Sequence, residues 1–80
     1  MEDYWASYLD ERERVVRIAL LAPNDRDALR FARALVDDRA RARRDTYLSK
    51  GIRMRIHVGH YRLLLLETDS GRRVYPIYPN

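Results

Sequence analysis

The sequence predicts an α+β fold in which one helix packs on one face of a small, mostly antiparallel sheet of three or four strands. Three observations predict it: an apolar arc with helical spacing in residues 28–36, alternation of apolar and polar residues in 52–58, and a turn-forming run at 68–71. The expected order is strand, helix and then three strands, preceded by an N-terminal aromatic segment. With 80 residues, the chain forms a single domain, 1–80.

The first segment, residues 2–9, is rich in aromatic side chains, and its periodicity fits a helix as well as a strand. Trp5, Tyr8 and Leu9 have helical spacing, whereas Tyr4, Ala6 and Tyr8 alternate as in a strand. The charged run 10–14 that follows predicts a solvated connection or the frayed start of a strand. We expect the aromatic segment to fold over the sheet face that the helix leaves open. Because a small monomer rarely exposes a large apolar surface, a second protein chain is the alternative cover.

A β-branched, apolar run at residues 15–21 predicts a strand that Pro23 ends. Asn24 and Asp25 are good N-cap residues, so a helix is expected over about 25–45. Its predicted core face is an apolar arc formed by Ala28, Leu29, Phe31, Ala32, Leu35 and Val36.

The second half of the chain predicts three further strands. Residues 52–58 alternate strictly, and we expect Phe31 and Leu35 to pack on their apolar face. A strand at 61–67 and a hairpin loop follow, in which Gly71 accepts a positive φ angle. The last strand, 74–78, contains Pro76 and is therefore expected at a sheet edge.

The strand at 61–67 is apolar on both faces. Leu63 and Leu65 are predicted to point to one side and Leu64 and Leu66 to the other. The single helix covers only one of these faces.

Arginine dominates the basic residues: fifteen of the sixteen are Arg, and Lys50 is the only lysine. A GC-rich genome explains this bias, and so does recognition of phosphate or carboxylate by the planar guanidinium. Five arginines fall on the helix arc opposite the core, whereas Arg39 and Arg43 fall on the core arc, which predicts that the helix runs past the edge of the core. The candidate binding surface comprises Arg26, Arg30, Arg33, Arg39, Arg41, Arg43 and Arg44 on the helix, and Arg53, Arg55, His57, Tyr61 and Arg62 on the strand pair.

Several chemistries have no residues to support them. The chain has no cysteine, no glycine-rich phosphate loop and no nucleophile motif, so neither a cofactor nor a catalytic residue is expected. His57 and His60 point to opposite faces of a continuous strand and make a poor zinc site, so no metal is expected. No apolar run approaches the length of a membrane span, and the acidic N-terminus lacks the features of a signal peptide, which predicts a soluble, cytoplasmic protein.

The run 55–69, with Arg55, Val58, Gly59, Tyr61 and Arg62 in the pattern R-x-x-V-G-x-Y-R, resembles the strand pair of RelE/ParE-type bacterial toxins. In the ribonuclease branch of that family, the resemblance implies ribosome-dependent mRNA cleavage, with Arg55 and Arg62 as the matching basic positions. In size and style the chain is also similar to phage-encoded inhibitors of the anti-CRISPR type.

The leading functional prediction is a non-enzymatic binding module. Its arginine-rich surface would engage nucleic acid or the acidic or nucleic-acid-binding surface of a protein complex, as a phage-type inhibitor does. The alternatives are a RelE-like endoribonuclease and a structural homodimer that pairs through the Leu64/Leu66 face.

Overall fold

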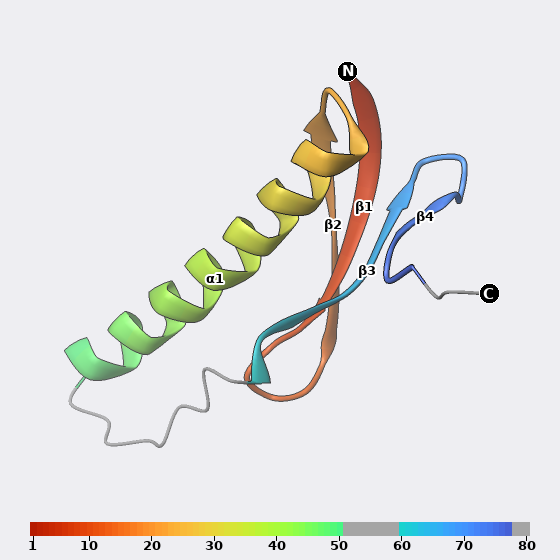
Figure 1. Ribbon diagram of the computed structural model, residues 1–80. Coiled ribbons are helices and arrows are strands. Elements are labelled where there is room, and N and C mark those ends of the chain that lie inside the picture. The colour runs from red at the N-terminus through yellow and green to blue at the C-terminus, as the bar shows by residue number, and fades with distance from the viewer. Residues whose placement is uncertain (51–59, 78–80) are drawn as a thin grey trace.

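The computed structural model describes residues 1–50 and 60–77 and confirms the α+β class (Figure 1). The described elements are β1 (Glu2–Leu9), β2 (Val15–Ala22), α1 (Asp25–Ser49), β3 (Arg62–Thr68) and β4 (Arg73–Tyr75). The strands form one sheet in the order β2-β1-β3-β4, and every neighbouring pair is antiparallel. The helix lies across one face of this sheet (Figure 1).

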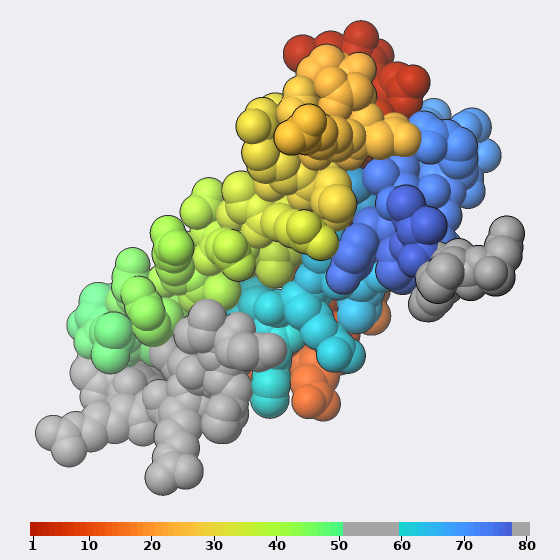
Figure 2. Space-filling model, in the orientation of Figure 1, coloured from red at the N-terminus to blue at the C-terminus, as the bar shows by residue number. Residues whose placement is uncertain are grey.

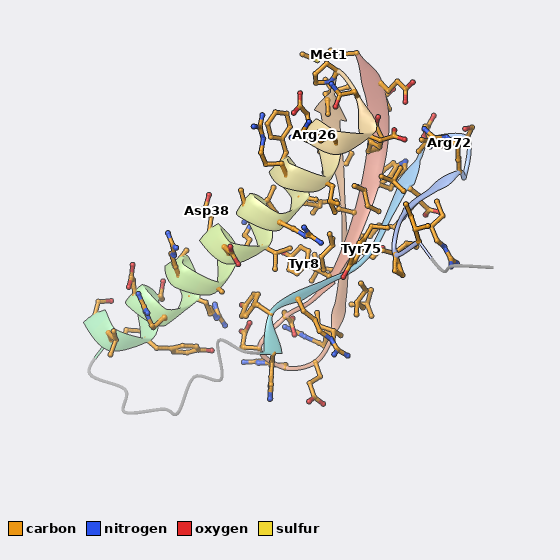
Figure 3. All side chains as sticks on the ribbon, in the orientation of Figure 1. Met1, Tyr8, Arg26, Asp38, Arg72 and Tyr75 are labelled. Atoms are coloured by element: carbon orange, nitrogen blue, oxygen red, sulfur yellow. The ribbon has the colours of Figure 1, made fainter. Side chains whose placement is uncertain are left out.

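The N-terminal aromatic segment is β1, a central strand of the sheet, so the expectation that it folds over an open face was wrong. It pairs with β2 along one side and with β3 along the other. Tyr4, Ala6 and Tyr8 are buried, and Tyr8 lies between the helix and the sheet in Figure 3. Trp5 alternates with them and points to the opposite face. The strand interpretation prevails because β1 finds a partner on each side, and one of these lies far along the chain.

The helix meets the sheet through a row of small residues. Ala28, Ala32, Val36 and Ala40, spaced four apart, are the buried residues of α1. Their size lets the helix approach the strands closely, and Tyr4 and Leu66 fill the space beneath as the largest fully buried side chains. Helical residues four apart lie one above the other, so this row forms a narrow contact stripe.

Phe31 lies at the flank of that stripe, and its predicted place in the core was wrong. The side chain is 42% exposed. The apolar arc was correct for Leu29, which packs against the core while partly buried. The expected contact between Phe31 and residues 52–58 falls outside the described residues.

The start of α1 follows the prediction, and its end lies further along the chain than expected. The Asn24 side chain accepts a 2.8 Å hydrogen bond from the main-chain N–H of Asp27 and caps the helix. The helix continues to Ser49 instead of ending near residue 45. Thr46 and Ser49 keep their hydroxyls within the helix by donating hydrogen bonds to the carbonyls of Ala42 and Thr46.

A bulge in β3 changes which leucines share a face. Tyr8 pairs with Leu63 and Ser7 with Leu65, so Leu64 is the extra residue. Leu66 is fully buried in the core on the helix side, and Leu63 packs against that same core. The predicted Leu64/Leu66 face, and pairing of two copies through it, therefore do not fit the fold.

The other features of the β3–β4 hairpin follow the predictions. Gly71 has φ 93°, and its N–H donates a 2.9 Å hydrogen bond to the Thr68 carbonyl. β4 is an edge strand, as predicted, but it ends at Tyr75, directly before Pro76. Proline cannot donate to a strand ladder, which explains the early end.

Candidate nucleic-acid interface

Five of the predicted arginines line the solvent side of α1. Arg26, Arg30, Arg33, Arg41 and Arg44 are all exposed, and we call this set the arginine ridge. At 1.5 Å per residue the ridge spans about 27 Å. Asp37 lies between its two halves on the same arc and is also exposed. In Figure 2, α1 forms one long border of the molecule, from orange-yellow to green.

The ridge guanidiniums are only loosely engaged within the protein. Arg30 Nη2 lies 3.1 Å from Asp27 Oδ1, and Arg44 Nε lies 3.8 Å from Asp45 Oδ1. Arg33 stacks over the Tyr75 ring, 5.3 Å from its centroid. Exposed ion pairs of this kind contribute little, so they compete weakly with an external anion.

Arg26 and Arg41 are the least engaged members of the ridge. Within residues 1–50 and 60–77, no ion pair or ring contact of either guanidinium is found. These two positions, one in each half of the ridge, are the cations most available to a ligand.

Arg43 has a different role, and the expectation that the end of the helix simply leaves the core was wrong at this position. Its Nε lies 2.8 Å from Glu11 Oε1, and its guanidinium covers the Tyr47 ring at 4.8 Å. The Tyr61 hydroxyl donates a hydrogen bond to the same Glu11 carboxylate. Arg43 of α1 and Tyr61, directly before β3, therefore both bind the β1–β2 turn, which removes them from the free binding surface.

The Glu11 contacts shift the ionisation of the groups around it. Burial raises the pKa of Glu11, but the hydrogen bond from Tyr61, a main-chain hydrogen bond and the charge of Arg43 together outweigh it and lower that pKa. Burial and the hydrogen bond to Glu11 raise the pKa of Tyr61 to about 12. Glu11 is therefore ionised and Tyr61 neutral near pH 7, the protonation states that this hydrogen bond needs.

The charged run 10–14 is an ordered turn around a buried carboxylate, so its description as a solvated connection was wrong. Asp10 is only 7% exposed. Its Oδ1 accepts the main-chain N–H groups of Arg12 and Arg14 at 2.8 and 2.9 Å, and its Oδ2 accepts Arg14 Nε at 3.1 Å. The main-chain N–H of Arg14 is the largest of the influences that lower the Asp10 pKa.

A groove of about 350 Å³ separates the second half of α1 from this turn. Both acids of the groove are already paired, Asp10 with Arg14 and Glu11 with Arg43. Arg39 is exposed at the rim and adds one cation beside the ridge. The groove is charge-balanced at its floor and basic at its rim.

The strand-pair candidates fall partly outside the residues that the structure describes. Arg53, Arg55 and His57 lie outside the described residues. Arg62 is exposed on β3 and shares a small hollow with His60, Leu9 and Glu13.

Sequence reasoning missed a cluster on the sheet face opposite the helix. The Arg17 guanidinium lies 4.1 Å from the centroid of the Trp5 ring and 3.6 Å from Glu67. Trp5 Nε1 donates a 3.0 Å hydrogen bond to Asp69. Only the pairing of three strands joins these residues, so no local signal in the sequence predicts the cluster.

No helix in the described ranges is long and apolar enough to cross a membrane. Comparison with protein-family models, with curated proteins and with solved structures found no match. Inference about function therefore starts from the chain's own residues.

Proposed function

We propose that this protein is a non-enzymatic module that binds the phosphate backbone of nucleic acid through the arginine ridge. One observation carries the proposal: five guanidiniums share one exposed helix face, and Asp37 lies on the same arc. Two further carboxylates of the helix, Asp27 and Asp45, pair with ridge arginines only through exposed contacts. The guanidinium is planar, always charged and able to bond two phosphate oxygens at once.

The dimensions of α1 favour a duplex as the ligand. A helix with its side chains is about 10–12 Å wide, close to the about 12 Å width of the B-DNA major groove. The long side chains of the ridge arginines would reach the phosphates that border the groove. Contacts of this kind fix position without reading sequence.

Three further expectations from the sequence bear on this proposal: a cytoplasmic location, a phage-type inhibitor and a ribonuclease. A cytoplasmic location is compatible with this proposal, and an inhibitor of the phage type would use the same ridge to occupy a nucleic-acid site. For the ribonuclease alternative, Tyr61 is engaged with Glu11 and Arg55 lies outside the described residues, so the proposal does not rely on either.

Direct binding to a labelled DNA duplex of about 20 base pairs, followed over a range of salt concentrations, tests the proposal. Arg26→Gln and Arg41→Gln should each weaken binding to all sequences alike and reduce the salt slope by about 1. Arg12→Gln is the matched control, because Arg12 is an exposed arginine of the β1–β2 turn and not a member of the ridge. Equal binding by the parent and by both ridge variants would remove the ridge from the interface.

A further inference from the structure

The two edges of the sheet are built differently. β4 is three residues long, carries a register shift against β3 and is followed by Pro76. Short length, bulges and proline are the devices with which proteins protect an edge from pairing with another strand. β2, at the other edge, has eight residues, contains no proline or glycine and pairs with β1 at all eight positions without a shift.

The only charged residue of β2 does not protect its edge. Arg17 reaches over the Trp5 ring of β1 and approaches Glu67 of β3. Both contacts draw the guanidinium across its own sheet and away from the free side of β2. Within residues 1–50 and 60–77, no other strand pairs with the main-chain groups along that side.

Large apolar side chains border this free edge. Val15 and Leu21 are 65% and 58% exposed on the sheet face opposite the helix. On the helix face, Val16 of β2 lines the groove together with Ala42 of α1. Exposed apolar residues of β2 thus lie on the sheet face opposite the helix, at both ends of the strand.

We propose that β2 pairs antiparallel with β2 of a second copy of this chain. Ile18 lies opposite Ile18 of the second copy, and the two-fold axis passes between them. In this register Val15 lies opposite Leu21 of the second copy, and the two most exposed apolar residues of β2 cover each other twice. Arg17 lies opposite Ala19 of the second copy, a small uncharged residue, so the two guanidiniums are not brought face to face. Val16 and Leu20 are paired in the same way on the helix face.

This complementarity of β2 with itself is the reason for choosing a second copy over an unrelated strand. A two-fold interface uses the same surface twice, so every favourable pair occurs in duplicate. A register centred on Ala19 would place Arg17 against Leu21 and leave Val15 uncovered. The sequence VVRIALLA therefore favours one self-pairing.

The dimer has a consequence that rests on the proposed function. Residues opposite each other in an antiparallel pair point to the same face, so both helices lie on one side of a continuous sheet. Two arginine ridges related by a two-fold axis then face the same way. The arrangement would suit a duplex with two equivalent contacts.

Sedimentation equilibrium without nucleic acid tests the dimer separately from nucleic-acid binding. Ala19→Arg places like charges opposite each other twice and should raise the dimer dissociation constant about tenfold. Ala19→Glu at the same position places a carboxylate against Arg17 and should leave that constant unchanged or lower it. The control is Ile77→Arg, a charge of the same sign at an exposed residue that follows β4 at the opposite edge, and it should behave as the parent.

Disulfide trapping tests the register, because the chain has no cysteine of its own. Val15→Cys and Leu21→Cys are six residues apart on one strand, about 20 Å, too far to bridge within a chain. Opposite positions on paired strands lie about 4.5–5.5 Å apart, within the range of a disulfide. Mixed single variants should therefore form a covalent heterodimer, whereas Val15→Cys alone should not cross-link.

Three results would overturn the proposal. The first is a parent protein that stays monomeric at all concentrations. This result would overturn the proposal even if β2 then binds a strand from another protein. The second is a dimer that Ala19→Arg and Ile77→Arg weaken equally. The third is a dimer that fails to cross-link in the mixed-variant experiment. If Ala19→Arg does not fold by circular dichroism, the cross-linking result decides alone.

Discussion

The hydroxyl of Tyr4 donates a 2.8 Å hydrogen bond to Oδ1 of Asp25, which joins the central strand to the first turn of the helix. The same carboxylate accepts two bonds from the Arg72 guanidinium, at 2.7 and 2.9 Å, from the β3–β4 loop (Figure 3). Tyr4 is fully buried, so its polar atom needs this partner. One side chain of the helix thus ties together β1 and the far hairpin.

Tyr4→Phe should lower the free energy of unfolding by about 1–2 kcal/mol, because it removes a buried hydrogen bond to a charged group and leaves the ring in place. The measurement is urea denaturation at one fixed protein concentration. Tyr8→Phe is the matched control: Tyr8 is a buried tyrosine of the same strand, and no hydrogen bond from its hydroxyl to another described residue is found. Equal losses in both variants would show that the Tyr4–Asp25 bond adds nothing.

The same contact predicts a pH dependence. The hydrogen bonds from Arg72 and then Tyr4 lower the pKa of Asp25 from 3.8 to about 2. A carboxyl group whose pKa is lower in the folded than in the unfolded chain stabilises the fold at pH values above its unfolded-state pKa. That stabilisation disappears as the pH falls from 3.8 through about 2. Arg72→Gln removes the largest cause, so this variant should lose less stability than the parent between about pH 5 and about pH 2.

Thermal melts across that range measure the effect. Because the Asp25 side chain is 41% exposed, added salt should shrink the difference between parent and variant. Arg12→Gln should keep the acid dependence of the parent. Parallel curves for parent and Arg72→Gln at low salt would contradict this assignment.

The alanine row of α1 predicts intolerance to larger side chains. Ala32 is fully buried against the sheet, so Ala32→Leu should cost about 1–3 kcal/mol through overpacking. Ala34, two residues away, is exposed, and Ala34→Leu should stay within about 0.5 kcal/mol of the parent. Urea midpoints of the two variants measure this difference, and similar midpoints would mean that the helix does not approach the sheet through this row.

The bulge in β3 predicts unequal roles for neighbouring leucines. Leu66 is fully buried, and Leu66→Ala should cost about 2–5 kcal/mol. Leu64 is the extra residue of the bulge and only partly buried, so Leu64→Ala should cost clearly less. Denaturation of both variants checks the order, and a larger loss at Leu64 would refute the register that places Leu66 beneath the helix.

Local features of the fold were predictable from the sequence. The Asn24 cap, the strand that ends before Pro23 and the positive φ of Gly71 each depend on residues within a few positions of one another. The exposure of the arginine ridge also follows from helical periodicity alone, because nothing in the fold overrides it.

Features that depend on distant partners were not predictable. Residues 2–9 fit a helix or a strand until β3, about 60 positions away, supplies the second pairing partner of β1. The core arc predicted for the helix was too wide, because it did not distinguish Ala32, which allows close approach to the sheet, from Phe31 at the flank. Asp10 looked like part of a solvated charge run, and only the turn geometry around it shows that it is buried.

The salt dependence of duplex binding tests the central claim most directly. Each phosphate neutralised on B-DNA contributes about −0.9 to the slope of log K against log salt concentration, so five ridge guanidiniums predict a slope of about −4 to −5. The measurement uses the parent chain and one duplex, titrated between about 50 and 200 mM salt. A slope in that range supports the arginine ridge as a phosphate-binding surface, whereas absence of binding at about 50 mM salt, or a slope shallower than about −1, would contradict it.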